Sequence, residues 1–253
     1  MNIVMKYPPL VLLVSLLLQW AAAYAGDFLR GRGRDLETDE RTAYGTILPA
    51  ALTLLGLIIG FSFSMAVSRY DQRKNYEEAE ANAIGTEYVR ADLLPAATAA
   101  QVRSLLFKYT DERIQFYRER DAERLGRINA DTARLQTDLW SAVATVATAN
   151  PTPVAALAAA GMNDVLNAQG YTQAAWWNRI PTTAWGLMVL IAMACNFLFG
   201  YSERRSHRRP LLILPVIASV AFFLIADIDS PRGGVIRVAP QNLIALSQSL
   251  TPR

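Results

Sequence analysis

The sequence predicts an all-α membrane protein with four transmembrane helices in two hairpins and a helical extramembrane domain between them. Apolar residues make up 52% of the 253 residues and are concentrated in four blocks with almost no charge. Each block is close to the length of about 20 residues that a helix needs to cross about 30 Å of hydrocarbon. The polar segment between the two pairs of blocks has helical periodicity and lacks the turn signals of β-hairpins. The blocks are residues 8–25, 47–67, 183–200 and 211–226.

These blocks divide the chain into four segments. Residues 1–68 are expected to form the first transmembrane hairpin, and residues 69–182 the extramembrane domain. Residues 183–228 are expected to form the second hairpin, and residues 229–253 a turn followed by a short amphipathic helix.

The first block has two interpretations. Lys6, the apolar run and the small residues before Gly26 resemble a secretory signal peptide with a cleavage site. Trp20 and Tyr24 near the end of the block favour a retained helix, because aromatic side chains anchor helices at the membrane interface.

The extramembrane segment is expected to consist of successive helices. The second span should continue as a charged helix up to Pro95, because no residue before it breaks the helical pattern. Further helices are expected over about 97–127, 129–147 and 154–168, the last of them ending at Gly170.

The composition argues against several classes of function. Cys195 and His207 are the only cysteine and histidine. The sequence therefore has too few of these residues for a histidine/cysteine metal cluster and offers almost no basis for a Cys–His nucleophile pair. The carboxylates that follow the second span lack the partners of a catalytic site. We therefore expect no enzymatic activity, cofactor or metal, and the net charge of +3 gives no reason to expect nucleic acid as a partner.

The second span carries a face of small residues. Gly56, Gly60 and Ser64 recur every four residues, which lets another helix approach closely. Packing within one protomer and packing between subunits both remain open on this pattern.

A second motif follows the last span. Asp227 and Asp229 lie at a membrane boundary, where acids are costly unless they are paired or solvated. Pro231 and Gly234 in the same "DIDSPRGG" segment are typical of a turn. A structural turn and an ion-coordinating site both remain open.

Two segments together resemble a known family. The stretch "GFSFSMAVSRYDQRKNYEEAEANAIGTEYVRADLLP", followed downstream by "DIDSPRGGVIRV", resembles the bacterial bestrophin-like family of membrane proteins over about residues 37–250. That family is distantly similar to bestrophins, which are pentameric channels whose second helix lines a pore with an apolar neck. The acidic calcium-binding run of animal bestrophins is missing here, so calcium gating is not expected.

The resemblance implies an oligomeric ion channel with a bestrophin-like fold, in which the second span lines the pore and the helical insert forms a vestibule. The candidate neck residues are Thr53, Leu57, Phe61 and Ser64, and the candidate pore-exit residues are Arg69, Arg73, Glu77, Glu80, Asn82 and Glu87. The expected partners are the lipid bilayer, inorganic ions and further copies of the chain, with a pentamer favoured by the resemblance alone. The alternative is a non-conducting membrane scaffold or sensor whose helical domain binds a partner.

The expected location is the bacterial inner membrane. The resemblance favours a cytosolic position for the insert, but the positively charged residues near the spans do not decide the orientation. Eight arginines flank one side and seven Lys or Arg residues flank the other.

Overall fold

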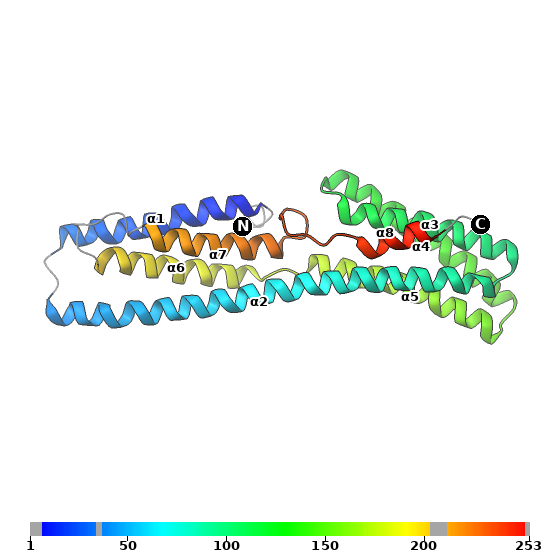
Figure 1. The fold of residues 1–253 in the computed structure, drawn as a ribbon, viewed down its shortest axis with the longest axis horizontal. Coiled ribbons are helices and arrows are strands. Elements are labelled where there is room, and N and C mark those ends of the chain that lie inside the picture. The colour runs from blue at the N-terminus through cyan, green and yellow to red at the C-terminus, as the bar shows by residue number, and fades with distance from the viewer. Residues whose placement is uncertain (1–6, 34–36, 203–211, 251–253) are drawn as a thin grey trace. The chain divides into compact units, whose positions relative to one another are not determined.

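The computed structural model describes residues 7–33, 37–202 and 212–250, which are predominantly helical (Figure 1). The chain divides into two compact units. Unit 1 comprises residues 1–69 and 179–237, and unit 2 comprises residues 70–178 and 238–253. Lys6 and the arginines at 34, 204, 205, 208 and 209, which entered the charge comparison, lie outside the described residues.

Unit 1 contains α1 (Pro8–Arg32), the first part of α2 (Thr38–Arg90), α6 (Thr182–Ser202) and α7 (Ile213–Asp229). Helix α1 packs against both α6 and α7. Among the described residues, three stretches are helical, long and apolar enough to cross a membrane, namely Pro8–Arg32, Thr38–Leu93 and Pro153–Ser202. Three of the predicted spans are therefore found. Helix α7 is apolar but has only 17 residues, which rise about 26 Å, so its crossing remains a prediction.

Helices α1 and α6 cross at a pair of glycines. A Cβ atom on Gly26 would overlap the Phe197 carbonyl, and one on Gly200 would overlap the Ala23 carbonyl. The buried face of α1 is built largely of small or polar residues: Pro8, Val11, Ser15, Gln19, Ala22, Ala23 and Gly26. Small residues let the two backbones come into van der Waals contact, which drives helix association where both helices already lie in an apolar medium.

A buried polar cluster joins α1, α6 and α7. Gln19 Nε2 donates to Ser219 Oγ at 3.1 Å, and Asn196 Nδ2 donates to Gln19 Oε1 at 3.1 Å. Asn196 Nδ2 also donates to the Ala192 carbonyl of its own helix at 2.8 Å. Hydrogen bonds between apolar helices fix their register, because a slip would leave these groups unpaired in hydrocarbon.

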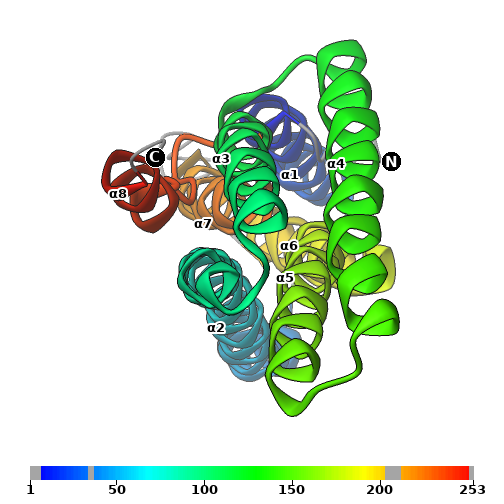
Figure 2. The same ribbon diagram turned by 90° about the vertical axis from the view of Figure 1, so that its right-hand side faces the viewer.

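Unit 2 contains the second part of α2, the 3-10 helix η2 (Ala91–Leu93), α3 (Ala96–Arg118), α4 (Ala122–Ala149), α5 (Pro153–Trp177) and α8 (Gln241–Ser249). Helix α4 packs against both α3 and α5, and α8 packs against α3 (Figure 2). Fully buried side chains of the core include Ile84, Leu106, Phe116, Leu139, Met162 and Leu243.

The helix boundaries agree with the expectations in part. Helix α2 and η2 do continue the second span almost to Pro95, and α8 forms the short C-terminal helix. The sequence placed the boundary between two helices near residue 128. This was wrong, because α3 ends at Arg118 and α4 begins at Ala122. Asp121 Oδ1 accepts a hydrogen bond from Arg124 N and caps α4 there.

The expected end of α5 at Gly170 was also wrong, since α5 continues to Trp177. An interior glycine costs a helix about 1 kcal/mol relative to alanine. Ala168 and Thr172 on either side of it are buried, and this packing outweighs that cost.

Candidate functional site

The membrane part of α2 has one buried stripe and a broad exposed face. Leu55, Ser62 and Ala66 are buried against the protomer. Thr53, Leu57, Phe61 and Ser64 are exposed. At about 100° per residue, Thr53, Leu57 and Ser64 lie within about 40° of one another and Phe61 lies about 80° from Thr53. The four predicted neck residues therefore lie on the side of α2 that the protomer leaves uncovered.

The exposed face of α2 is more extensive than those of the other two candidate spans. Only 17% of the apolar window of Thr38–Leu93 is buried, against 33% for Pro8–Arg32 and for Pro153–Ser202. No described atom lies within 4 Å of a Cβ built on Gly56 or Gly60. Within the described part of the chain these glycines therefore pack closely against no other helix, and packing between subunits remains a prediction.

The Thr53 hydroxyl group finds its hydrogen-bond acceptor within its own helix. Its Oγ1 donates to the Pro49 carbonyl at 2.9 Å, so this face can lie in an apolar environment without an unsatisfied donor. Leu57 and Phe61 are 53% and 66% exposed, which is a large uncovered apolar area on a single helix.

The structure places most of the predicted pore-exit residues inside the protomer. Arg73, Glu77, Glu80 and Glu87 are at most 1% exposed, and each belongs to unit 2. Of the predicted exit residues, only Asn82 is exposed. Buried charged groups need internal partners, and these partners come from helices that the sequence pattern of α2 does not reveal. The protomer itself therefore encloses these four side chains.

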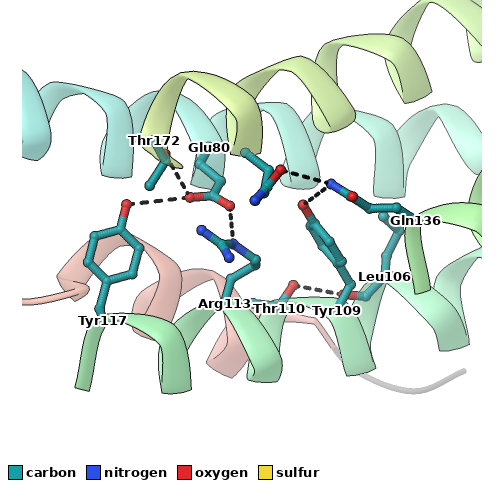
Figure 3. Close-up of polar contacts among 9 residues, drawn as sticks. Glu80, Leu106, Tyr109, Thr110, Arg113, Tyr117, Gln136 and Thr172 are labelled. Atoms are coloured by element: carbon teal, nitrogen blue, oxygen red, sulfur yellow. Dashed lines mark hydrogen bonds and ion pairs between the residues drawn. The ribbon is translucent and has the colours of Figure 1, made fainter. Parts of the chain in front are cut away.

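Glu80 is the centre of a buried polar network between α2, α3 and α5 (Figure 3). Its Oε1 accepts a hydrogen bond from Arg113 Nε at 2.5 Å. Its Oε2 accepts from the hydroxyl groups of Tyr117 at 3.4 Å and Thr172 at 3.1 Å. Both Glu80 and Arg113 are fully buried, so their charges compensate each other in place of water.

The surroundings of this pair shift the pKa values of its neighbours. Burial, together with the Glu80 charge, raises the pKa of both Tyr109 and Tyr117 above the usual range for a tyrosine. Burial acts against the charge on Arg113, but the Glu80 carboxylate raises the pKa of Arg113 overall. The Arg113 guanidinium also lies over the Phe116 ring at 4.3 Å from its centroid. The Arg113 guanidinium thus keeps its charge in the core.

Glu77 attaches the C-terminal helix to α2. Its carboxylate accepts hydrogen bonds from Leu243 N at 2.9 Å and from Asn242 Nδ2 at 2.7 Å. These donors lie in the first turn of α8, where the free N–H groups and the helix dipole favour a negative charge. Glu77 therefore caps a helix that is remote in sequence.

The two acids at the end of α7, Asp227 and Asp229, lie where a turn of unit 1 begins. The Asp227 carboxylate accepts hydrogen bonds from Val235 N and Ile236 N, both at 2.8 Å. A Cβ on Gly234 would overlap the Asp227 carbonyl, so the turn needs glycine there. Pro231, at the start of the turn, is buried.

Asp229 links the segment just before α6 to the end of the apolar part of α2. Its carboxylate accepts from Ile180 N at 3.2 and 3.3 Å and pairs with Arg69 at 3.6 Å. Of the two interpretations of this motif, these contacts support the structural turn. Arg69, expected at the pore exit, is held by this acid.

Sequence reasoning missed three features that organise the protomer: the Gly26 and Gly200 crossing, the polar cluster around Gln19, and the partner of Glu80. A glutamine inside an apolar block is a signal of helix association that was available. Arg113 gave a further signal, because it continues, at helical spacing, the buried face that Leu106, Tyr109 and Phe116 form on α3.

Comparison with known proteins agrees with this architecture. A family model described as Bestrophin-like domain matches residues 13–243. A variant of a bacterial bestrophin homolog from Klebsiella pneumoniae superimposes with a TM-score of 0.64 at 15% identity, covering 96% of this chain and 93% of that one. A second crystal structure of that homolog gives 0.61 at 16% identity, with 95% and 94% covered.

No match was found among curated proteins. Among the described residues, no group of three or more His, Cys, Asp or Glu side chains is arranged to hold a metal ion. The solved structures establish the likeness of fold, and the family model covers most of the chain. The chain is therefore a membrane protein that belongs to the Bestrophin-like family.

Proposed function

We propose that the protein is an oligomeric ion channel in which the exposed face of α2 lines the pathway. The observation that carries the proposal is the uncovered side of α2 at Thr53, Leu57, Phe61 and Ser64. Family membership supports it, because bestrophins use their second helix in this way. Copies of α2 around a symmetry axis would enclose a pathway that four helices of one chain cannot form.

The chemistry of this face predicts a neck that is apolar and uncharged. Leu57 and Phe61 repeated around an axis form hydrophobic rings, which control conduction by excluding water when they are narrow. Thr53 and Ser64 lie on either side of these residues along α2 and supply hydroxyl groups that water or ions can contact. The charged groups Arg73, Glu77, Glu80 and Glu87 do not contribute, because they are buried in the protomer.

The remaining parts of the proposal follow from this arrangement. Helix α7 acts as a fourth span, despite its length, through local thinning of the bilayer or help from its flanks. Unit 2 forms a vestibule, with Asn82 among its exposed residues. We assign the protein to the bacterial inner membrane, with unit 2 in the cytosol and a pentamer as the assembly, by the family resemblance.

The oligomeric state is the first test. Native mass spectrometry of the purified chain in detergent should give a closed oligomer, with a pentamer expected. A monomer would exclude a pathway on a symmetry axis.

Ion flux through liposomes is the second test. Reconstituted wild-type protein should pass ions, and Leu57→Ala and Phe61→Ala should each raise the flux because they widen the apolar neck. Phe63→Ala is the matched control, since Phe63 is 42% exposed on the same helix but lies about 160° from Phe61 and about 120° from Leu57. Its flux should equal that of the wild type.

Two results would count against the channel. Well-inserted wild-type protein that passes no ions would favour the alternative, a scaffold or sensor whose helical unit binds a partner. Equal effects of Phe61→Ala and Phe63→Ala on the flux would show that the predicted neck face does not differ from the rest of the exposed side of α2.

A further inference from the structure

Glu87 is a buried acid whose carboxylate the protomer does not satisfy. It lies in the part of α2 that belongs to unit 2 and is fully buried. Neither of its carboxylate oxygens has a hydrogen-bond partner among the described residues. An ionised carboxylate in such a place loses its hydration with no hydrogen bond to replace it, whereas the neutral acid loses much less. Glu77 and Glu80 differ from Glu87, because both carboxylate oxygens of each accept hydrogen bonds.

The space for the Glu87 side chain is provided by a glycine of α5. A Cβ atom on Gly161 would overlap Glu87 Oε2 and also Arg90 Nη1. The missing side chain thus makes a notch in α5 that receives the carboxyl group from α2. Ala158, Met162 and Val165 of α5 are buried around this turn, so the helix surface there is apolar.

The charges that act on Glu87 come from two helices. Arg90 of α2 favours the ionised form, and Asp164 of α5 opposes it. Arg90 is itself shared, because its Nη1 lies 3.9 Å from Asp164 Oδ2. On the neighbouring elements, Arg103 of α3 pairs with Asp92 of η2. Burial is the largest influence and raises the pKa of Glu87 from 4.5 to about 7.

We propose that Glu87 makes the contact between α2 and α5 proton-dependent: the contact is closed when the carboxyl is protonated and loosens when it ionises. The proposal concerns one protomer and does not rest on the channel function. The sign follows from the direction of the pKa shift. An acid with a raised pKa in the closed state holds its proton more tightly there than in an opened state exposed to water. Stability of the contact therefore falls as the pH rises from about 4.5 to about 7, and the loss is complete above that range.

Hydrogen exchange on the full chain in nanodiscs tests the proposal. Peptides covering residues 80–90 and 155–170 are followed at pH 6 and pH 8.5 after correction for intrinsic exchange rates. If the opened state titrates near 4.5, local opening should be on the order of tenfold more frequent at pH 8.5 than at pH 6. In Glu87→Gln the two pH values should give equal protection, because the amide does not titrate.

The matched control is Glu78→Gln, an exposed acid on the same helix, which should keep the wild-type response. A Glu87→Gln variant that keeps the full wild-type pH response would overturn the proposal. So would a Glu78→Gln variant that loses it, since the response would then belong to the surface of α2.

A spectroscopic measurement covers the case in which Glu87→Gln fails to fold. Infrared spectra of the wild type should show a protonated carboxyl C=O band at pH 6 that disappears by pH 8.5. Glu78→Gln should retain this titration with a midpoint near 7. Absence of any carboxyl band that titrates near this pH in either protein would also overturn the proposal.

Discussion

The buried pair of Glu80 and Arg113 gives the sharpest test of how unit 2 is held together. The perturbation is Arg113→Met, which keeps the length of the side chain but removes the guanidinium. Glu80 would then keep only the hydroxyl groups of Tyr117 and Thr172, at 3.4 and 3.1 Å. Because Glu80 is fully buried, no water replaces the lost partner.

The size of the effect follows from the isolation of the remaining charge. Breaking a buried pair by removing one partner costs about 3–5 kcal/mol, much of it for the uncompensated charge. For a chain of this length, each kcal/mol lowers Tm by about 2–4 °C, so the expected decrease is on the order of 10 °C. The double variant Glu80→Gln/Arg113→Met removes both charges and should recover most of the loss, since replacing a whole buried pair is often close to neutral.

The assay is thermal unfolding of the purified full chain in one detergent, followed by circular dichroism. Arg134→Met is the matched control, because Arg134 pairs with Asp131 in an exposed position and screening by water leaves such pairs little effect. An Arg113→Met variant as stable as the control would refute the reasoning. A double variant no more stable than Arg113→Met would refute it as well, because the cost would then arise from lost packing.

Three further predictions concern other contacts. Gly200→Leu should strongly destabilise the chain, since its side chain meets backbone of α1, whereas Gly186→Leu on the same helix meets nothing within 4 Å and should be tolerated; the yield of folded protein in size-exclusion chromatography separates them. Asp227→Ala leaves two backbone N–H groups without their acceptor and should lower stability by about 1–3 kcal/mol, measured as a Tm decrease that Asp227→Asn partly restores. Glu77→Ala removes the cap of α8 and should make the C-terminal segment sensitive to limited proteolysis, while protection equal to that of the wild type would contradict the capping role.

The sequence predicted the elements that depend on local pattern. The uninterrupted helix from the second span to η2 follows from the absence of a breaking residue, and α8 follows from the spacing of its leucines. The end of α5 was misplaced because a glycine is only a weak breaker inside a helix that packs on both sides of it.

For the candidate site, the sequence pattern separates the apolar part of α2 from its charged part. Thr53, Leu57, Phe61 and Ser64 are exposed on the apolar part, and their place in a pore remains a prediction. The charged residues that follow could not be placed in this way. A buried Glu80 and an exposed Glu78 look alike in sequence, and the difference comes from Arg113, 33 residues away in α3.

The central claim is that the exposed face of α2 lines an ion pathway. Thiol modification tests this claim most directly. Cys195 is the only cysteine and is buried, so Cys195→Ala gives a background without reactive thiols. Ser64→Cys places a thiol on the exposed face, and Ser62→Cys places one on the buried stripe two residues away. In liposomes, a bulky methanethiosulfonate reagent should block most of the ion flux through Ser64→Cys and leave Ser62→Cys unchanged. Full conduction through Ser64→Cys after confirmed modification would contradict the account.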